Sequence, residues 1–381
     1  MTSGAHRPLS ILGIRGIPAA HGGFETFAER LALHLQGRGW AVSVYCQHEG
    51  APSLREEHWR SIRLVHIAVP GDGPGSTMRF DWACIRHAAQ ERPTCLTLGY
   101  NTALFCVWLR LKGVRNVINM DGIEWRRSKW SAAARAWFWL NERAGCWLGD
   151  TLVADHPEIA RHLATRARAD KIVTIPYGAD ELHEADPAPL AALGLEPGRY
   201  LTLIARAEPE NSILEIVDGY SRRPRGVPLV VLGAYRDDNP YHRAVRERAG
   251  PEVRFVGAIY ERGTLEALRT HTLAYMHGHR VGGTNPSLVE ALGAANAVVA
   301  HDNPFNRWVA GDAALYFSDA AGVDEAVGRL LADEAELVQR RSAARSRHAA
   351  EFRWAPVLDR YETLLAQADS QGRPRTQALN A

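Results

Sequence analysis

Short apolar runs alternate with longer amphipathic stretches along most of the chain, and this rhythm restricts the fold more than any other feature. The runs are rich in Val, Ile and Leu and are continuous rather than interleaved with polar residues. Such runs are typical of parallel strands that helices cover on both faces. In the first half the predicted strands are Leu9–Ile14, Ala41–Cys46, Ile62–Ala68, Thr94–Leu98, Asn116–Asn119, Thr151–Ala154 and Lys171–Ile175. In the second half they are Tyr200–Ala205, Leu229–Leu232, Val253–Val256, Leu273–Met276, Ala297–Ala300 and Leu315–Phe317.

The segments between these runs predict helices. The clearest is Phe24–Leu35, which keeps its apolar residues on one face. The others are Ser212–Tyr220, Thr264–Arg269, Ser287–Ala294, Asp324–Leu331 and the helical stretch Glu334–Ala368. Two such series in 381 residues predict an α/β chain with two doubly wound parallel sheets. We expect domains at 1–177 and 178–350, a C-terminal helix at 351–368 and a flexible polar tail at 369–381.

Charge and cysteine usage narrow the class of protein. Lys and Arg number 45 and Asp and Glu 43, so the net charge of +2 gives no basic field for nucleic acid. The five cysteines form no CxxC pair, and we expect reduced core thiols. No apolar stretch has the length of a signal-peptide core or of a membrane span. These features favour a cytoplasmic protein and leave contact with the inner face of the cell membrane open.

Ligands of open α/β sheets bind outside the carboxyl ends of the strands, so two sheets predict a site in the cleft between them. After the first strand, Gly22 and Gly23 precede a helix. Paired glycines there let backbone amides approach an anion at the positive helix end. The pattern is not GxGxxG, and a plain strand–helix loop remains the alternative.

A second anion site is expected where the strand Leu273–Met276 leads into a helix. Asn285 is a suitable N-cap and Pro286 a suitable first helical residue. Gly282 and Gly283 give the loop a flexible approach. We expect the ligand of this site to contact the residues Gly282, Gly283, Thr284, Asn285, Glu290 and His279. Glu290, in an otherwise apolar helix, would accept hydrogen bonds from a ribose diol, and the alternative is a solvated glutamate.

Two further features of the second half carry competing interpretations. Arg206 directly follows a strand and could neutralise a phosphate, or it could pair with Glu208 or Glu210 on the surface. His277 and His279 share a strand face, and metal binding is one interpretation of this arrangement. No third ligand lies at suitable spacing, so hydrogen-bonded histidines are favoured and no metal is expected.

The strand Asn116–Asn119 is followed by carboxylates, an indole and guanidinium groups, a mixture that carbohydrate sites use. Glu124, Trp125 and Arg126 are the candidates for binding a saccharide acceptor, and Asp121 is a candidate catalytic group. An N-capped helix start is the alternative. The stretch Trp125–Trp147 contains five tryptophans and several cations, which indicates either an interfacial face or a helix packed into the domain.

Five segments together resemble the glycosyltransferase family 4 subgroup with a DUF1972-type N-domain, whose better-known members are bacterial rhamnosyltransferases. They are GIRGIPAAHGGFETFAERL, NMDGIEWRRSKW, IPYGAD, ARAEPENSI and HGHRVGGTNPSLVEALGAANAVVAHDNPFNRWV. The resemblance covers about Ile11 to Tyr361. It implies a GT-B fold with an acceptor-side N-domain, a nucleotide-sugar-binding C-domain and a C-terminal helix that returns to the N-domain. It also implies metal-independent, retaining transfer without a cofactor.

The resemblance assigns roles to single residues. Gly22 and Gly23 match the glycine loop near the diphosphate, Arg206 the phosphate-binding arginine, and Glu290 the second Glu of the Glu-x7-Glu motif. The chain departs from the family at two positions, because Gly282 replaces the first Glu of that motif and Asn211 replaces the usual phosphate-binding lysine. Both departures bear on how the donor is held.

Asp121 lies at or near the place where relatives that use ordinary hexoses carry a histidine. A 6-deoxy sugar offers a methyl group there, so a carboxylate would serve ring hydroxyls or the acceptor instead. The resemblance therefore implies transfer of L-rhamnose from dTDP-β-L-rhamnose to a saccharide or polyprenyl-diphosphate-linked acceptor in polysaccharide biosynthesis. The alternatives are transfer of another hexose from UDP-glucose or UDP-N-acetylglucosamine, and a non-catalytic nucleotide-sugar-binding scaffold.

Overall fold

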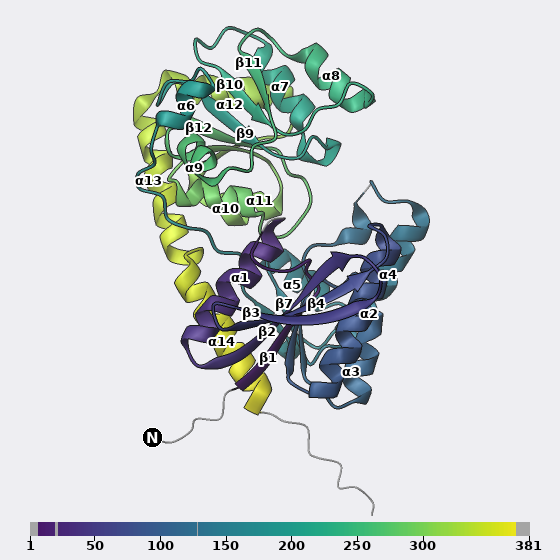
Figure 1. Cartoon of the computed structure of the whole chain (residues 1–381). Coiled ribbons are helices and arrows are strands. Elements are labelled where there is room, and N and C mark those ends of the chain that lie inside the picture. Colours follow the sequence, from purple (N-terminus) through teal and green to yellow (C-terminus); the bar gives the residue numbers. More distant parts are fainter. Residues whose placement is uncertain (1–6, 20–21, 128, 371–381) are drawn as a thin grey trace, which may run out of the picture. The chain divides into compact units, whose positions relative to one another are not determined.

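The computed structural model describes residues 7–19, 22–127 and 129–370 (Figure 1). The chain divides into two compact units. Unit 1 contains the described residues up to Pro176 and those from Ala355 onward, and unit 2 contains Tyr177–Trp354. The expected tail lies outside the described residues from 371 onward. Each unit is a largely parallel sheet with helices on both faces, which confirms the α/β prediction.

Unit 1 has an eight-stranded sheet within the described residues, in the order β3-β4-β2-β1-β5-β6-β7-β8. Every neighbouring pair is parallel except β3 and β4, which are antiparallel. The strands are β1 (Arg7–Leu12), β2 (Trp40–Glu49), β3 (Ser53–Trp59), β4 (Ile62–Val69), β5 (Thr94–Leu98), β6 (Asn116–Asn119), β7 (Thr151–Ala154) and β8 (Ile172–Thr174).

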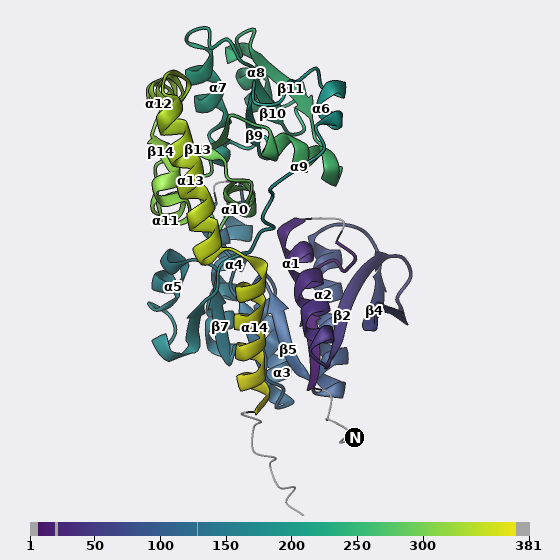
Figure 2. The ribbon, with the colours of Figure 1, turned by 90° about the vertical axis from the view of Figure 1, so that its left-hand side faces the viewer.

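The helices of unit 1 lie in two groups. They are α1 (Gly22–Gly37), α2 (Pro74–Glu91), α3 (Val107–Leu111), α4 (Ala132–Leu148), α5 (Pro157–Leu163) and α14 (Trp354–Ser370), with short 3-10 turns at Ala103–Cys106, Glu124–Arg126 and Ala169–Lys171. The C-terminal helix α14 packs beside α1 (Figure 2), where the rings of Phe27 and Tyr361 lie 4.7 Å apart. In the other group α2 contacts α3, since Trp82 packs edge-on against Trp108 at 6.1 Å.

Unit 2 has a six-stranded parallel sheet within the described residues, in the order β11-β10-β9-β12-β13-β14. Its strands are β9 (Leu201–Ile204), β10 (Leu229–Leu232), β11 (Val253–Gly257), β12 (Ala274–His277), β13 (Ala297–His301) and β14 (Ala314–Phe317). Its helices are α6 (Ala188–Ala192), α7 (Ile213–Ser221), α8 (Pro240–Arg248), α9 (Arg262–Thr270), α10 (Pro286–Gly293), α11 (Pro304–Ala310), α12 (Ala320–Ala332) and α13 (Glu334–Glu351), with 3-10 turns at Pro209–Asn211 and Gly311–Ala313.

The two larger apolar clusters of unit 2 lie on opposite faces of its sheet, and a third joins the sheet to α6 and α9. One of the larger clusters joins the sheet to α7 and α12 through residues such as Ile216 and Val323, both fully buried. The other joins it to α10, α11 and α13 through residues such as Leu292 and Ala344. A parallel sheet covered on both faces presents its carboxyl ends as the free edge, so loops after β9 and β12 are placed to bind ligands.

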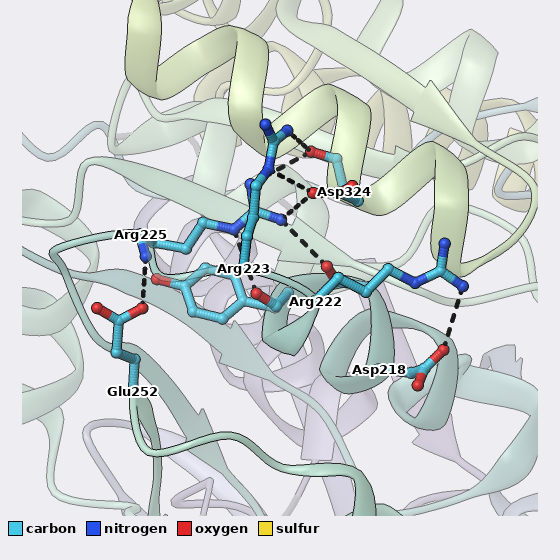
Figure 3. A network of polar contacts seen from close by, with 8 residues as sticks. Asp218, Arg222, Arg223, Arg225, Glu252 and Asp324 are labelled. Atoms are coloured by element: carbon cyan, nitrogen blue, oxygen red, sulfur yellow. Dashed lines mark hydrogen bonds and ion pairs between the residues drawn. The ribbon is translucent and has the colours of Figure 1, made fainter.

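An arginine network connects α7, the following loop and α12 (Figure 3). Arg225 donates to Asp324 at 2.5 Å, and its side chain is only 3 % exposed. Arg223 donates to the same carboxylate at 2.7 Å. Because both guanidinium groups already pair with Asp324, the network joins the loop after α7 to α12 and is not a candidate anion site.

The structure adds one strand to those predicted and locates the break within one helical stretch. The edge strand β3 was not predicted, because its sequence SLREEHW has no apolar run and all but its last residue are exposed. The helical stretch Glu334–Ala368 consists of two helices, α13 and α14, and α14 begins near the expected start of the C-terminal helix at 351. The stretch breaks where Ala179 donates its backbone N–H to the Phe352 carbonyl at 2.8 Å and pairs with Arg353 as an isolated bridge.

All five cysteines are buried and free. Among the described residues, no helix combines the length and the apolarity needed to cross a bilayer.

Candidate functional site

Arg206 lies just beyond the carboxyl end of β9, and its side chain is exposed. Within the described ranges it forms neither an ion pair nor a side-chain hydrogen bond, so the pairing with Glu208 or Glu210 is absent. An exposed guanidinium without a carboxylate partner can neutralise an incoming phosphate at little cost. Arg206 therefore contrasts with Arg225, whose charge is already compensated.

The loops after β9 and β12 fit closely together. These strands are neighbours, with Leu203 opposite Met276, so both loops leave the same edge of the sheet. A Cβ on Gly278 would lie 2.0 Å from the Asn211 carbonyl oxygen, so only glycine fits there. The Asn211 amide donates to the Arg206 carbonyl at 2.8 Å. Asn211, at the position of the family's lysine, thus shapes the loop that carries Arg206.

The predicted start of α10 is confirmed. Pro286 is the first helical residue, and Asn285 caps the helix by accepting a hydrogen bond from the Ser287 N–H at 3.1 Å. Thr284 is buried, whereas Gly282 and Gly283 are partly exposed. Gly282 has φ +128 and open space where a Cβ would be, so the absent glutamate leaves room here. Pro286 has no N–H, and the N–H groups of Ser287, Leu288 and Val289 already bond to Asn285, so the attraction for an anion at this end comes from the helix dipole.

Glu290 is not a solvated glutamate. It forms an ion pair with Arg269 of α9, and its side chain is 37 % exposed. The carboxylate is therefore held by one partner while part of it stays accessible. A ribose diol would bind at the accessible oxygen with Arg269 still in place.

The two histidines after β12 stack on each other, with ring centroids 4.5 Å apart. Burial, His279 and His301 lower the pKa of His277 well below its ordinary value, so this imidazole is neutral. In the part of the chain that the structure describes, neither ring belongs to a group of three possible metal ligands. The one such group there is His34, Asp359 and Glu362, and Arg38 contacts both of its carboxylates, at 3.0 and 3.5 Å.

In unit 1 the glycine loop leads into α1, which begins at Gly22 with φ +73. Carboxylates of the helix already hold this loop. The backbone N–H groups of Arg15 and Ala19 donate to Glu25 at 3.4 Å and to Glu29 at 2.6 Å. A phosphate near Gly22 and Gly23 would approach these two acidic side chains, which makes this end of α1 less favourable for an anion than that of α10.

Asp121, directly after β6 and Met120, has the strongest perturbation of the predicted site residues in unit 1. Its φ of +49 is uncommon for a residue with a side chain, and such strain is frequent at functional sites. Burial, followed by the nearby Glu124, raises its pKa to about 6. Its backbone N–H donates to Asn119, whose amide in turn donates to the Tyr361 hydroxyl at 2.9 Å. These bonds hold the backbone of Asp121 in place, while burial favours the protonated form of its carboxyl group.

The three predicted acceptor residues are already engaged. Glu124 accepts hydrogen bonds from Arg127 at 2.6 Å and from the Trp130 indole at 3.1 Å. The Trp125 indole donates to Glu142 at 2.7 Å. Arg126 is exposed and lies 5.2 Å from the centroid of the Trp125 ring. Of the three, Arg126 is the most available to a ligand.

A pocket of about 350 Å³ lies at the carboxyl ends of β1, β2 and β4, and the sequence did not reveal it. Polar residues in its lining include Arg15, His48, His66 and Asp72. His48 is hydrogen-bonded to His66, whose other nitrogen lies 3.0 Å from Glu57. His48 follows the predicted strand Ala41–Cys46 and His66 lies within the predicted strand Ile62–Ala68, but the contact with Glu57 depends on the unpredicted strand β3.

Residues 6–180, slightly less than half of the chain, match a family model described as a domain of unknown function, DUF1972. This confirms the DUF1972-type N-domain. Among curated proteins, none matches the chain significantly.

Solved structures match nearly the whole chain at low identity. A sucrose-phosphate synthase from Thermosynechococcus elongatus is 18% identical, with a TM-score of 0.79 over 96% of this chain and 100% of that one. The Anabaena protein HepE, solved in complex with UDP and glucose, is 14% identical, with a TM-score of 0.73 over 95% and 100%. A UDP-forming α,α-trehalose-phosphate synthase from Burkholderia vietnamiensis is 13% identical, with a TM-score of 0.70 over 95% and 100%. At these identities the likeness shows the fold, and the chain has the GT-B fold of two Rossmann-like parallel-sheet domains.

Proposed function

We propose that the chain is a retaining glycosyltransferase that moves L-rhamnose from dTDP-β-L-rhamnose to a saccharide or polyprenyl-diphosphate-linked acceptor. The observation that carries this proposal is Arg206, an exposed and unpaired guanidinium in the loop after β9, whose neighbour β12 leads into the capped helix α10. Departure of a nucleoside diphosphate places negative charge on phosphate oxygens, and a cation together with the positive end of a helix dipole stabilises such charge. The GT-B fold shared with structures titled as UDP-forming or UDP-bound supports a nucleotide-sugar donor.

The reaction needs few groups from the protein. The bond from the sugar's anomeric carbon to the diphosphate breaks, and the acceptor oxygen forms its bond on the same face. The acceptor proton passes to a leaving phosphate oxygen, so no protein base is required. Arg206 and the first turn of α10 compensate the charge that develops, and no metal or cofactor takes part in the proposal.

Glu290 and Asp121 are assigned to binding and positioning. Glu290 accepts hydrogen bonds from the ribose while Arg269 holds its second oxygen. Asp121 accepts hydrogen bonds from ring hydroxyls of the donor or from the acceptor hydroxyl, a role that its raised pKa restricts to pH values above about 6. Transfer of glucose from a UDP donor is the second candidate, because HepE was solved with UDP and glucose.

Replacement of Arg206 tests the proposal. Arg206→Ala should lower kcat about 10²-fold or more, because a charge directed at the leaving group is lost. Arg199→Ala is a matched control, since Arg199 is an exposed arginine that precedes β9 at the opposite end of the strand. Turnover by Arg206→Ala equal to that of Arg199→Ala would remove Arg206 from the mechanism.

A further inference from the structure

The helix α4 exposes apolar side chains and buries polar ones. Trp139, Leu140 and Trp147 are 43%, 44% and 67% exposed, whereas Asn141 and Glu142 are 0% and 1% exposed. A surface helix of a globular protein normally has the reverse arrangement. The exposed apolar stripe of α4 therefore indicates a surface that contacts an apolar partner.

Contacts on the buried side fix this orientation of α4. The Glu142 carboxylate accepts hydrogen bonds from Trp125 and lies 2.9 Å from His162 and 2.6 Å from Arg166. Asn141 accepts a hydrogen bond from the Leu104 N–H at 2.9 Å. Rotating the helix to bury its tryptophans would carry Glu142 away and leave the largely buried Arg166 without its carboxylate partner, which is strongly unfavourable. The outward apolar stripe is thus built into the packing of unit 1.

The stripe continues onto the neighbouring 3-10 turn and α3. Leu104, Val107 and Leu111 share one helical face and are 38%, 36% and 71% exposed. Arg110 joins α3 to α4 by donating to the Trp147 carbonyl at 3.2 Å, and Figure 1 shows both helices near α2. We call this surface the apolar face; its members are Trp82, Leu104, Val107, Leu111, Trp139, Leu140 and Trp147.

The apolar face is concentrated rather than scattered. Seven of the ten exposed large apolar side chains among the described residues belong to it. Single exposed apolar residues are normal, but a gathering of them marks an interaction surface.

Charges around the apolar face are positive. Lys112, Arg135 and Arg143 form no ion pair with a carboxylate within the described residues. The Arg143 guanidinium lies 3.5 Å from the centre of the Trp139 ring, and the Lys112 ammonium lies 5.0 Å from that of Trp108. The only acidic residue of α4 is the buried Glu142, and α3 has none. A second copy seated face to face would bring these cations together, so the charge pattern disfavours self-association.

We propose that the apolar face binds the surface of a bilayer that contains anionic lipid. Tryptophan and leucine side chains flanked by lysine and arginine are the groups that insert at the boundary between headgroups and acyl chains. Unpaired cations add electrostatic attraction to anionic lipid. Of the five tryptophans in the stretch Trp125–Trp147, only Trp139 and Trp147 belong to the apolar face. The other three, Trp125, Trp130 and Trp137, are only partly exposed, and their indole nitrogens are hydrogen-bonded within unit 1.

Co-sedimentation of the full chain with vesicles tests the proposal. Vesicles of phosphatidylcholine alone are compared with vesicles that also contain phosphatidylglycerol, at low and high salt. We expect binding to the anionic vesicles at low salt and at least about tenfold weaker binding at high salt, where surface charges are screened. The variant Leu111→Ser/Trp147→Ser should bind at least about tenfold more weakly, since it removes the two most exposed apolar groups of the face.

The control variant Leu54→Ser/Val338→Ser removes two exposed apolar residues elsewhere, which are 50% and 59% exposed, and should bind like the wild type. All variants should keep the wild-type melting temperature. Binding does not depend on sugar transfer, so failure of either proposal leaves the other intact. Three outcomes would overturn this one: no binding to anionic vesicles at low salt, equal binding by the Leu111/Trp147 variant, or a dimer in light scattering that this variant abolishes.

Discussion

Replacing Asp121 by Asn should make the protein more stable and less active at the same time. Burial raises the pKa of Asp121 from its ordinary value of 3.8 to about 6, and the negative charge of Glu124 adds to this effect. Asn has the same shape and tolerates the positive φ of +49. Its side-chain oxygen can still accept the hydrogen bond that the Gly122 N–H donates to Asp121. The substitution therefore removes the charge and little else.

The sign and size follow from proton linkage. A carboxyl whose pKa is raised on folding destabilises the folded state once the pH exceeds its unfolded value, and the loss is complete above the folded value. With values of 3.8 and about 6, the loss is about 1.6 kcal/mol at pH 5 and about 3 kcal/mol at pH 8. Asp121→Asn should recover up to these amounts, which corresponds to a rise in melting temperature of about 6–12 °C at pH 8.

Thermal unfolding of the wild type and of Asp121→Asn at pH 5 and pH 8 measures the difference in stability. Steady-state kinetics measures the activity of the two proteins. We expect kcat to fall more than nucleotide affinity does. Asp81→Asn is a matched control, because burial also raises the pKa of Asp81 to about 6, although Asp81 lies on α2 and accepts a hydrogen bond from Thr102. It should gain stability without losing kcat. A stability difference between wild type and Asp121→Asn that does not grow from pH 5 to pH 8 would refute the reasoning.

Two further predictions concern metal and loop packing. Activity should survive EDTA, because Arg206 and α10 compensate the charge of the leaving group. His277 and His279 also have no third metal ligand among the described residues. Loss of activity in EDTA with recovery in Mg²⁺ would contradict this prediction. Gly278→Ala should destabilise unit 2 and weaken dTDP binding at least about tenfold, because its Cβ would meet the Asn211 carbonyl at 2.0 Å. Gly75→Ala is the control, because a Cβ at this position would meet nothing within 4 Å. The affinity for dTDP is measured by titration into both variants, and equal affinities would contradict the prediction.

The parallel strands were predictable because their signal is local. Leu229–Leu232 is a continuous apolar run, Thr94–Leu98 and Asn116–Asn119 combine apolar residues with Thr or Asn, and each forms a strand with those bounds. The edge strand β3 carries no such run and is defined by its pairing with β4, which sequence periodicity does not contain. The break between α13 and α14 lies near the expected boundary at 350/351, but the contact with Ala179 at this break joins residues far apart in the chain and was not predicted.

The candidate site shows the same division. The cap at Asn285 follows from neighbouring residues and was predicted. The pairing of Glu290 with Arg269 and the contact of His66 with Glu57 join separate elements, so they appear only in the folded chain. The reversed burial of α4 depends on the partners of Glu142 on other elements, and periodicity alone would have buried its tryptophans.

Turnover of a panel of nucleotide sugars tests the proposed function most directly. The panel contains dTDP-β-L-rhamnose, UDP-glucose and UDP-N-acetylglucosamine, and the measurement is release of the nucleoside diphosphate. We predict turnover that prefers dTDP-β-L-rhamnose by about 10²-fold, as expected of a pocket that lacks the hydroxyl-binding histidine. Equal or faster turnover of UDP-glucose would contradict the rhamnose assignment alone. Binding of the donors without release of nucleoside diphosphate from any of them would contradict the glycosyltransferase itself.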